Sequence, residues 1–280
     1  MSYRIQHTVT APEPPVTEWL PKNRAEEAAA RAKKVDLIAG VRGRVPVVLR
    51  NNGDGTWTQT TPFKAVPPAV SVSGVRAFAW GDLDGDGDPD AVLVGERGDV
   101  HVFENRQAGE FREMPAGPGL GTVVAVAIGD LDGDGDLDLV ALDAAGAVTR
   151  TSLRNGNWNI ERVATWPDAI DPAAVGTYRL FLEDVDNNGA IDLIASGGGA
   201  TRIWLEGRRA GPTTTAPAPL QVDGDVVAVA DVNGDGMLDL VGRDAQWIGK
   251  GTKGYHWQVL RPRAQPTAGD QRINAFAVGG

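Results

Sequence analysis

The sequence predicts an all-β protein that is built from repeats, and two observations lead to this prediction. A nine-residue stretch rich in Asp and Gly occurs four times, beginning at residues 82, 130, 184 and 231, so the copies start 48, 54 and 47 residues apart. A period of this size is typical of repeat architectures. Each copy also lies between short apolar runs, such as 75–80 and 91–94 around the first. Apolar runs of this length, bounded by Gly and Asp clusters, indicate buried strands.

The spacing within the repeated stretch predicts a cation site. Oxygens at positions 1, 3, 5 and 9 of a tight loop, with a backbone carbonyl at position 7, suit Ca²⁺, which takes six to eight oxygen ligands. Position 6 is Gly in all four copies, as the sharp turn of such a loop requires. The predicted side-chain ligands are Asp82, Asp84, Asp86 and Asp90; Asp130, Asp132, Asp134 and Asp138; Asp184, Asp186, Asn188 and Asp192; and Asp231, Asn233, Asp235 and Asp239. The predicted carbonyl ligands belong to Asp88, Asp136, Ala190 and Met237.

We therefore expect about four Ca²⁺ ions per chain. In the third and fourth loops one carboxylate is replaced by a neutral amide, Asn188 or Asn233, so we expect weaker binding there. The helix–loop–helix calcium hand is the main alternative. It requires a bidentate Glu at position 12 and a helix on each side. Position 12 is Leu93, Ala141, Ala195 or Gly242, and the flanking runs are of strand type, which argues against a hand.

These residues resemble a known family. The unit is similar to the FG-GAP/VCBS repeat of calcium-binding β-propellers, the type found in integrin α-subunit heads and in many bacterial surface proteins. The matching motifs are the four D-x-[DN]-x-[DN]-G-x-x-D loops, the Asp-Leu-Val or Asp-Leu-Ile that follows several of them, and the N-N-G-D-G-T-W turn at 51–57. The resemblance covers about residues 35–280. It implies a β-propeller of four-stranded antiparallel blades, in which Ca²⁺ holds the loop between the first and second strands of four blades.

The blades follow the chain in order. Residues 1–34 are unlike the rest and are predicted to form an N-terminal extension, with a linker at 11–15 and a short helix over 23–33. The predicted blades lie near 35–63 together with 273–279, and near 75–114, 123–164, 177–222 and 226–261. The first blade keeps the strand 35–40 but has no ligand set before it.

The C-terminus suggests how the ring closes. Residues 273–280 align with 75–82, a first strand that stops where a metal loop would begin, and the first blade lacks a clear first strand. We therefore expect 273–279 to pair with 35–40 and to close a ring of five blades, which removes exposed sheet edges. The alternative is a fragment of a larger, seven-bladed propeller.

Charge and composition limit the partners. The formal net charge is -10, and sixteen of the 37 acidic residues lie in the four loops, so four Ca²⁺ would leave a net charge of about -2. This acidity argues against nucleic acid as a partner. No run of eighteen apolar residues predicts a membrane span, there is no cysteine, and no signal peptide is visible in this chain. We expect the protein to be secreted, periplasmic or on the cell surface, because such loops suit millimolar external calcium. We also expect it to be a monomer.

The predicted function is that of a non-catalytic structural module or binding module for a protein or glycan. Recurrent aromatic residues at Trp57, Phe111, Trp158 and Trp257, and at Trp204 and Trp247, are interpreted as packing between blades rather than as sugar platforms. The alternative is a polysaccharide-active enzyme, a glycosidase or lyase. Acids outside the loops are scattered along the chain, and no catalytic or cofactor-binding residue is assigned.

Overall fold

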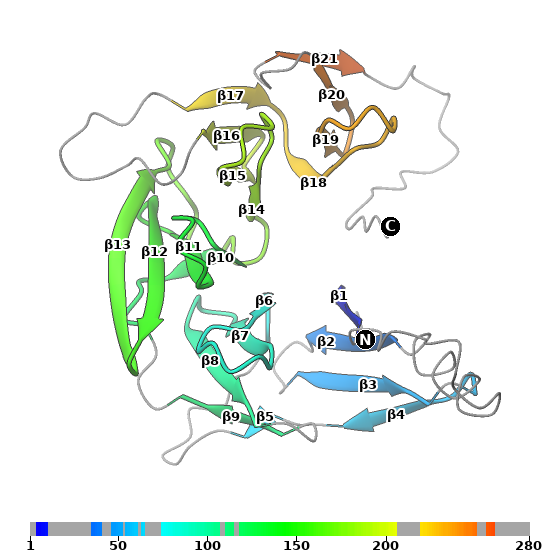
Figure 1. Ribbon diagram of the computed structural model, residues 1–280, viewed down its shortest axis with the longest axis vertical. Helices are drawn as coiled ribbons and strands as arrows, with labels where there is room; N and C mark the ends of the chain where they lie inside the picture. The colour runs from blue at the N-terminus through cyan, green and yellow to red at the C-terminus, as the bar shows by residue number, and fades with distance from the viewer. Residues whose placement is uncertain are drawn as a thin grey trace.

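The computed structural model describes residues 4–10, 35–40, 46–52, 54–60, 63–64, 74–106, 110–114, 118–205, 219–250 and 256–260. The regular secondary structure of these residues consists of β-strands alone, and the strands form five sheets. The sheets lie side by side around an arc, and the first strand of each faces the middle (Figure 1). The all-β propeller arrangement predicted from the sequence is therefore confirmed.

The strand bounds show how the repeats map onto the sheets. The first sheet contains β1 (Arg4–Thr10), β2 (Val35–Gly40), β3 (Val47–Asn51) and β4 (Trp57–Thr60). The second contains β6 (Ala77–Gly81), β7 (Asp90–Val94), β8 (Val100–Asn105) and β9 (Phe111–Glu113), with β5 (Phe63–Lys64) added outside β9. The third contains β10 (Val123–Gly129), β11 (Asp138–Asp143), β12 (Ala147–Arg154) and β13 (Asn157–Thr165). The fourth contains β14 (Arg179–Glu183), β15 (Asp192–Gly197), β16 (Ala200–Trp204) and β17 (Leu220–Asp223). The fifth contains β18 (Val226–Ala230), β19 (Asp239–Gly242), β20 (Gln246–Lys250) and β21 (His256–Leu260).

The first sheet differs from the prediction in the origin of its first strand. β1 pairs antiparallel with β2, from Arg4 opposite Gly40 to Thr10 opposite Val35, and β3 pairs with the other edge of β2. A strand has only two edges, so the predicted pairing of 273–279 with 35–40 is wrong: the N-terminal strand takes that place. Residues 4–10 therefore belong to a sheet and not to an extension. Residues 273–279 and the helix predicted over 23–33 lie outside the described residues.

The core lies along the second strands. β7, β15 and β19 are buried at every residue, and β11 is buried at every residue but its last. Both faces of these strands are covered, so their sequences are continuous apolar runs. They therefore do not alternate between apolar and polar residues as half-exposed strands do. One core cluster extends from Ala79 in β6 through Val140 in β11 to Trp204 in β16, and so joins three sheets. Packing between sheets, rather than within one sheet, holds the arc together.

A short strand between the first and second sheets was not predicted. β5 pairs parallel with β9, with Phe63 opposite Phe111. The Phe63 ring contacts Phe103 and Phe111, with ring centroids 5.1 and 5.2 Å apart, in an aromatic cluster that also includes Trp80. The connection between the two sheets is thereby fixed to the outer edge of the second sheet.

Most of the recurrent aromatic residues pack in the core, although Phe111 contacts Phe63 and Trp80 of its own sheet rather than a neighbouring blade. Trp204 and Trp247 are buried, and Phe111 and Trp158 pack against core clusters. Trp57 is an exception, because it is 45% exposed on β4, the outermost strand of the first sheet. The packing interpretation is therefore wrong for Trp57, and the side chain of Trp257 lies outside the described residues. In the described part of the chain, no helix is long and apolar enough to span a bilayer.

Gly176 lies where the sheets approach one another closely, and Gly156 provides a comparison in open space. Gly176 has φ +74°, donates its N–H to the Val124 carbonyl at 2.9 Å, and has no room for a Cβ, which would clash with the Arg76 carbonyl oxygen. Gly156 has a similar φ of +73°, in the hairpin turn between β12 and β13, but open space around it.

Gly156→Ala should cost about 1–2 kcal/mol of stability from the left-handed backbone alone. Gly176→Ala should lower the free energy of unfolding by more than Gly156→Ala does, because the added Cβ also clashes with the Arg76 carbonyl oxygen. Urea denaturation of both variants measures the two losses. Equal losses would contradict the close packing at Gly176.

Candidate metal centres

The four Asp-rich loops occupy equivalent places in the fold. The first loop (82–90) joins β6 to β7, the second (130–138) joins β10 to β11, the third (184–192) joins β14 to β15, and the fourth (231–239) joins β18 to β19. Each therefore connects the first and second strands of its sheet, as predicted. Because these strand pairs have the same direction in each sheet, all four loops lie at the same end of the sheets.

Each loop is shaped by the carboxylate at position 1. In the third loop, Asp184 accepts the N–H of Asn188 at 3.0 Å on Oδ1 and the N–H of Gly189 at 2.7 Å on Oδ2. The equivalent two bonds recur in the other three loops, on Asp82, Asp130 and Asp231. The position 5 side chain in turn accepts the N–H of position 7, at 2.7–2.9 Å. The backbone of each loop is thus wrapped around its own side-chain oxygens.

The carboxylate at position 9 is buried at the base of each loop. Asp90, Asp138, Asp192 and Asp239 are at most 2% exposed. In every case Oδ2 accepts the N–H of position 2 at 3.0–3.1 Å, which ties the end of the loop to its beginning. Position 2 is an apolar residue that is buried in the first three loops, whereas Val232 in the fourth is 39% exposed.

Glycine at position 6 is explained by the backbone. Gly87, Gly135, Gly189 and Gly236 have φ between +83° and +96°, a region that other residues rarely adopt. Position 4 also has positive φ. It is Gly in three loops and Asn187, with φ +55°, in the third. Asn tolerates this conformation better than most residues, so the third loop keeps the turn despite its altered sequence.

Three of the loops bring carboxylate oxygens together as a metal site requires. One oxygen from each of three residues lies within 4.8 Å of the others in the sets Asp82, Asp84 and Asp86; Asp130, Asp132 and Asp138; and Asp184, Asp186 and Asp192. Oxygens that each lie 2.3–2.6 Å from one Ca²⁺ are separated by at most about 5 Å, so these sets fit the ion. In the fourth loop the amide of Asn233 replaces a carboxylate and donates to Asp235 at 3.0 Å.

Comparison with known proteins identifies the repeat. Residues 33–93, 82–141 and 184–242 match the model of the FG-GAP-like repeat, and together these matches cover more than half of the chain. The chain belongs to the FG-GAP-like repeat family. The three matched segments contain all four loops, and the first includes the strand β2, which lacks a loop with ligands.

Other comparisons are less close. A solved structure of an Agrocybe aegerita lectin, described as recognising non-reducing terminal N-acetylglucosamine, has 18% sequence identity to this FG-GAP protein and a TM-score of 0.48. The match covers 80% of this chain and 62% of the lectin, so the chain spans less than two thirds of the lectin's length. No curated protein sequence matches the chain significantly.

The electrostatics of the FG-GAP loops favour a bound cation. Burial raises the pKa of Asp90 and of Asp138 to about 6, and carboxylates of the same loop act in the same direction. Burial also raises the pKa of Asp84 and Asp186. In the exposed fourth loop, the N–H of Gly236 and further backbone N–H groups hold the pKa of Asp231 below its usual value. The buried carboxylates therefore carry a charge that is costly without a counter-ion.

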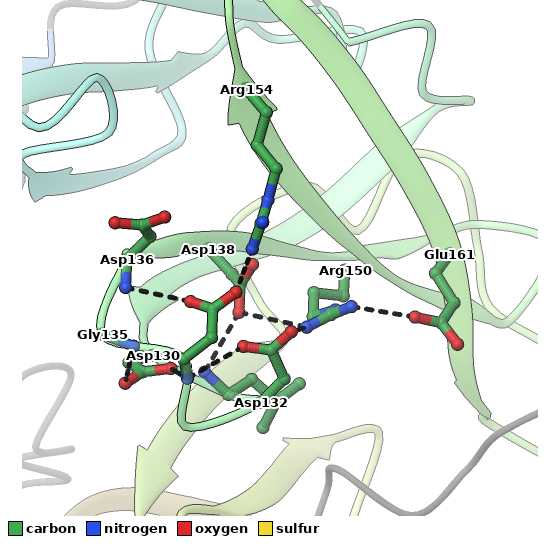
Figure 2. Close-up of polar contacts among 10 residues, drawn as sticks. Asp130, Asp132, Gly135, Asp136, Asp138, Arg150, Arg154 and Glu161 are labelled. Carbon is green, nitrogen blue, oxygen red and sulfur yellow. Dashed lines mark hydrogen bonds and ion pairs between the residues drawn. The ribbon is translucent and has the colours of Figure 1, made fainter.

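Two arginines of β12, which were not predicted from the sequence, contact the second loop (Figure 2). Arg150 in β12 forms ion pairs with Asp132 and, at 3.7 Å, with Asp138. Arg154, at the end of β12, forms an ion pair with Asp134. The signal was present in the sequence as two basic residues on the strand that runs back toward the loop, but only the register of β11 and β12 shows that they reach it.

Several acids outside the loops form local hydrogen bonds or ion pairs with His or Arg side chains. His101 lies between Asp99 at 2.7 Å and Glu113 at 2.5 Å, Glu104 pairs with Arg106 at 2.8 Å, and Glu161 accepts from Arg150 at 2.9 Å. These pairs lie within single sheets. They support pairing between neighbouring strands.

A cleft of about 440 Å³ separates the first and second loops. Its lining includes Asp82 and Asp84 from the first loop and Asp136 from the second. It also includes Leu153 and Arg154 at the end of β12 and Asn155 in the turn that follows. The cleft therefore opens at the same end of the sheets as the predicted metal ligands.

The raised pKa values predict an unusual pH dependence. Asp90 and Asp138 have a pKa of about 6 in the folded, metal-free chain and about 3.9 when unfolded, so the folded state binds protons more tightly. Lowering the pH from about 7.5 to about 5.5 should therefore raise the melting temperature of the metal-stripped chain. With saturating Ca²⁺ the gain should vanish, because protons then compete with the ion.

Differential scanning fluorimetry at several pH values measures this effect. Asp90→Asn is the control variant, because it removes one of the two titrating groups and should reduce the gain. A melting temperature of the metal-stripped chain that falls steadily over this pH range would contradict the prediction.

Proposed function

We propose that this protein is a calcium-stabilised FG-GAP propeller that acts as a structural or binding module outside the cytoplasm. The observation that carries the proposal is the repetition of one loop geometry four times at one end of the sheets, with acidic side chains converging in three of the loops. Turns of merely polar character would not need the same set of backbone bonds to side-chain oxygens in every copy.

The chain's own residues would hold the ion. Side-chain oxygens at positions 1, 3, 5 and 9 already accept backbone N–H groups, so the loop is shaped before any ion enters. Bound Ca²⁺ would neutralise carboxylates that otherwise repel one another. Because the unfolded chain cannot present these oxygens together, the ion would bind the folded state preferentially and stabilise it. An ion of this kind suits a compartment with millimolar calcium: secreted, periplasmic or on the cell surface.

We place the binding face at the loop end of the sheets. The loops there are carried by a rigid scaffold of buried strands, an arrangement that suits recognition. The cleft between the first and second loops is polar and hollow enough for a few sugar rings or a short peptide segment. The partner is a protein or a glycan, and the protein itself is a monomer in this proposal.

A substitution in the third loop tests the metal site. Asp184→Asn removes one negative charge from the set Asp184, Asp186 and Asp192. The affinity of one Ca²⁺ should fall at least tenfold, about 1.4 kcal/mol, because charge count sets the affinity of such loops. Titration calorimetry of the metal-stripped chain measures it. Asp223→Asn, an exposed acid outside the loops, is the control and should change nothing. Unchanged binding in Asp184→Asn would contradict the assignment.

A second pair of variants tests the binding face. Asp136 and Asp88 both occupy position 7, where only the backbone carbonyl is a predicted ligand, but only Asp136 lines the cleft. Asp136→Lys should weaken binding of an oligosaccharide or peptide selected from arrays at least tenfold, with the calcium count unchanged. Asp88→Lys should bind like the wild type. Equal effects of the two variants on ligand binding would place the binding face elsewhere.

A further inference from the structure

We propose that Arg150 and Arg154 are built-in counter-ions of the second FG-GAP loop, so that this loop binds Ca²⁺ more weakly than the first although both contain five acids. This inference rests on the proposed function, because it compares the calcium affinities of loops that are proposed to bind the ion. It also reverses one expectation from the sequence, in which the number of carboxylates alone made the second loop one of the two strongest sites.

Arg150 is held in place from both sides of its strand. It lies opposite Val140 of β11 and opposite Glu161 of β13, and its Nη2 donates to Glu161 Oε2 at 2.9 Å. Its Nη1 forms the ion pair with Asp132 and lies 3.7 Å from Asp138 Oδ2. The side chain is only 13% exposed. Figure 2 shows the guanidinium between Glu161 on one side and Asp132 and Asp138 on the other.

The oxygens that Arg150 meets belong to the metal set. Asp132 and Asp138 are two of the three residues whose oxygens converge in this loop. A buried guanidinium beside them satisfies part of their charge with directed contacts. An incoming Ca²⁺ would have to displace Arg150 or bind next to a positive charge, and either costs affinity.

Arg154 neutralises a further ligand position. Its ion pair is with Asp134, the predicted ligand at position 5, and lies at the exposed side of the loop. Together, the two arginines change the formal charge of the second loop from -5 to about -3, which is the charge of a loop with three acids.

Among the residues that the structure describes, no arginine is paired with a carboxylate of the other three loops in this way. The strand registers align Arg150 with Val102, Ile203 and Gln246, because these residues pair with Val92, Ile194 and Val241 as Arg150 pairs with Val140. Arg154 aligns with Arg106 in the second sheet, but Arg106 pairs with Glu104 at 2.8 Å. Two loops with the same acidic sequence therefore differ in their counter-ions.

The consequence concerns the middle of the molecule. The second loop belongs to the third of the five sheets, whose strands contribute the largest share of the main core cluster. With its own counter-ions, this sheet stays ordered at calcium concentrations at which the loops of its neighbours lose their ions. Calcium would then govern the second, fourth and fifth sheets more than the third.

The test compares the metal content of the full chain with and without the arginines. The variants are Arg150→Met with Arg154→Gln, Arg154→Gln alone, and Arg106→Gln as the matched control. Native mass spectrometry counts bound Ca²⁺ over a series of free concentrations. The double variant should bind one more ion than the wild type at limiting calcium, and addition of Asp132→Asn should remove that ion. Arg106→Gln should match the wild type.

Thermal unfolding supplies a second measurement. In excess chelator the double variant should melt several degrees below the wild type, and Ca²⁺ should restore most of the loss. Arg154→Gln serves if the double variant does not fold. Arg154 is 52% exposed, so this variant should keep the fold, and it should still raise the Ca²⁺ affinity of one site several-fold. Equal ion counts and affinities in all variants would overturn this inference and leave the calcium proposal intact. No bound ion in any variant would overturn both.

Discussion

One buried aspartate at the start of the second strand holds each Asp-rich loop to its sheet. Asp90, Asp138, Asp192 and Asp239 are inaccessible to solvent, yet each begins a strand that is itself buried. A carboxylate in such a place needs hydrogen bonds and a positive partner. The N–H of position 2 supplies one bond in every loop, and in the first and fourth loops an N–H of the third strand, from Asn105 or Gly249, supplies another. In these two loops the aspartate thus links the start of the loop to the second and third strands.

The same constraint explains why the loops are so acidic and so regular. A buried charge is costly with only one or two N–H groups as partners, and a loop that surrounds it with further oxygens is suited to a cation. Two arrangements are seen among the described loops. Three loops bring carboxylate oxygens together as a cation site requires, and in the second loop Arg150 and Arg154 also form ion pairs with its carboxylates. Each arrangement leaves the backbone of the loop unchanged, which is why sequence repeats alone do not distinguish them.

Much of the fold followed from local sequence, and the exceptions have physical reasons. The loops, their glycines and the buried second strands were predicted because their chemistry is contained in nine or fewer neighbouring residues. The pairing of β1 with β2 was missed because twenty-four residues separate the two strands and nothing in β1 matches the repeat. β5 is too short to have a period. Arg150 and Arg154 were missed because their role depends on the register between β11 and β12. Trp57 was assigned to the core by its repeat position, but its side chain is 45% exposed, whereas Trp158 at the same position packs against the core.

Thermal unfolding of the metal-stripped chain, with and without millimolar Ca²⁺, shows whether the four loops are calcium sites when bound ions are counted in parallel. Addition of Ca²⁺ should raise the melting temperature by many degrees, with three or four ions bound per folded chain, and excess chelator should return it to the lower value. An unchanged melting temperature with no bound ion would contradict calcium binding by the loops. The carboxylates at the base of the loops would then have to be balanced by protein groups alone.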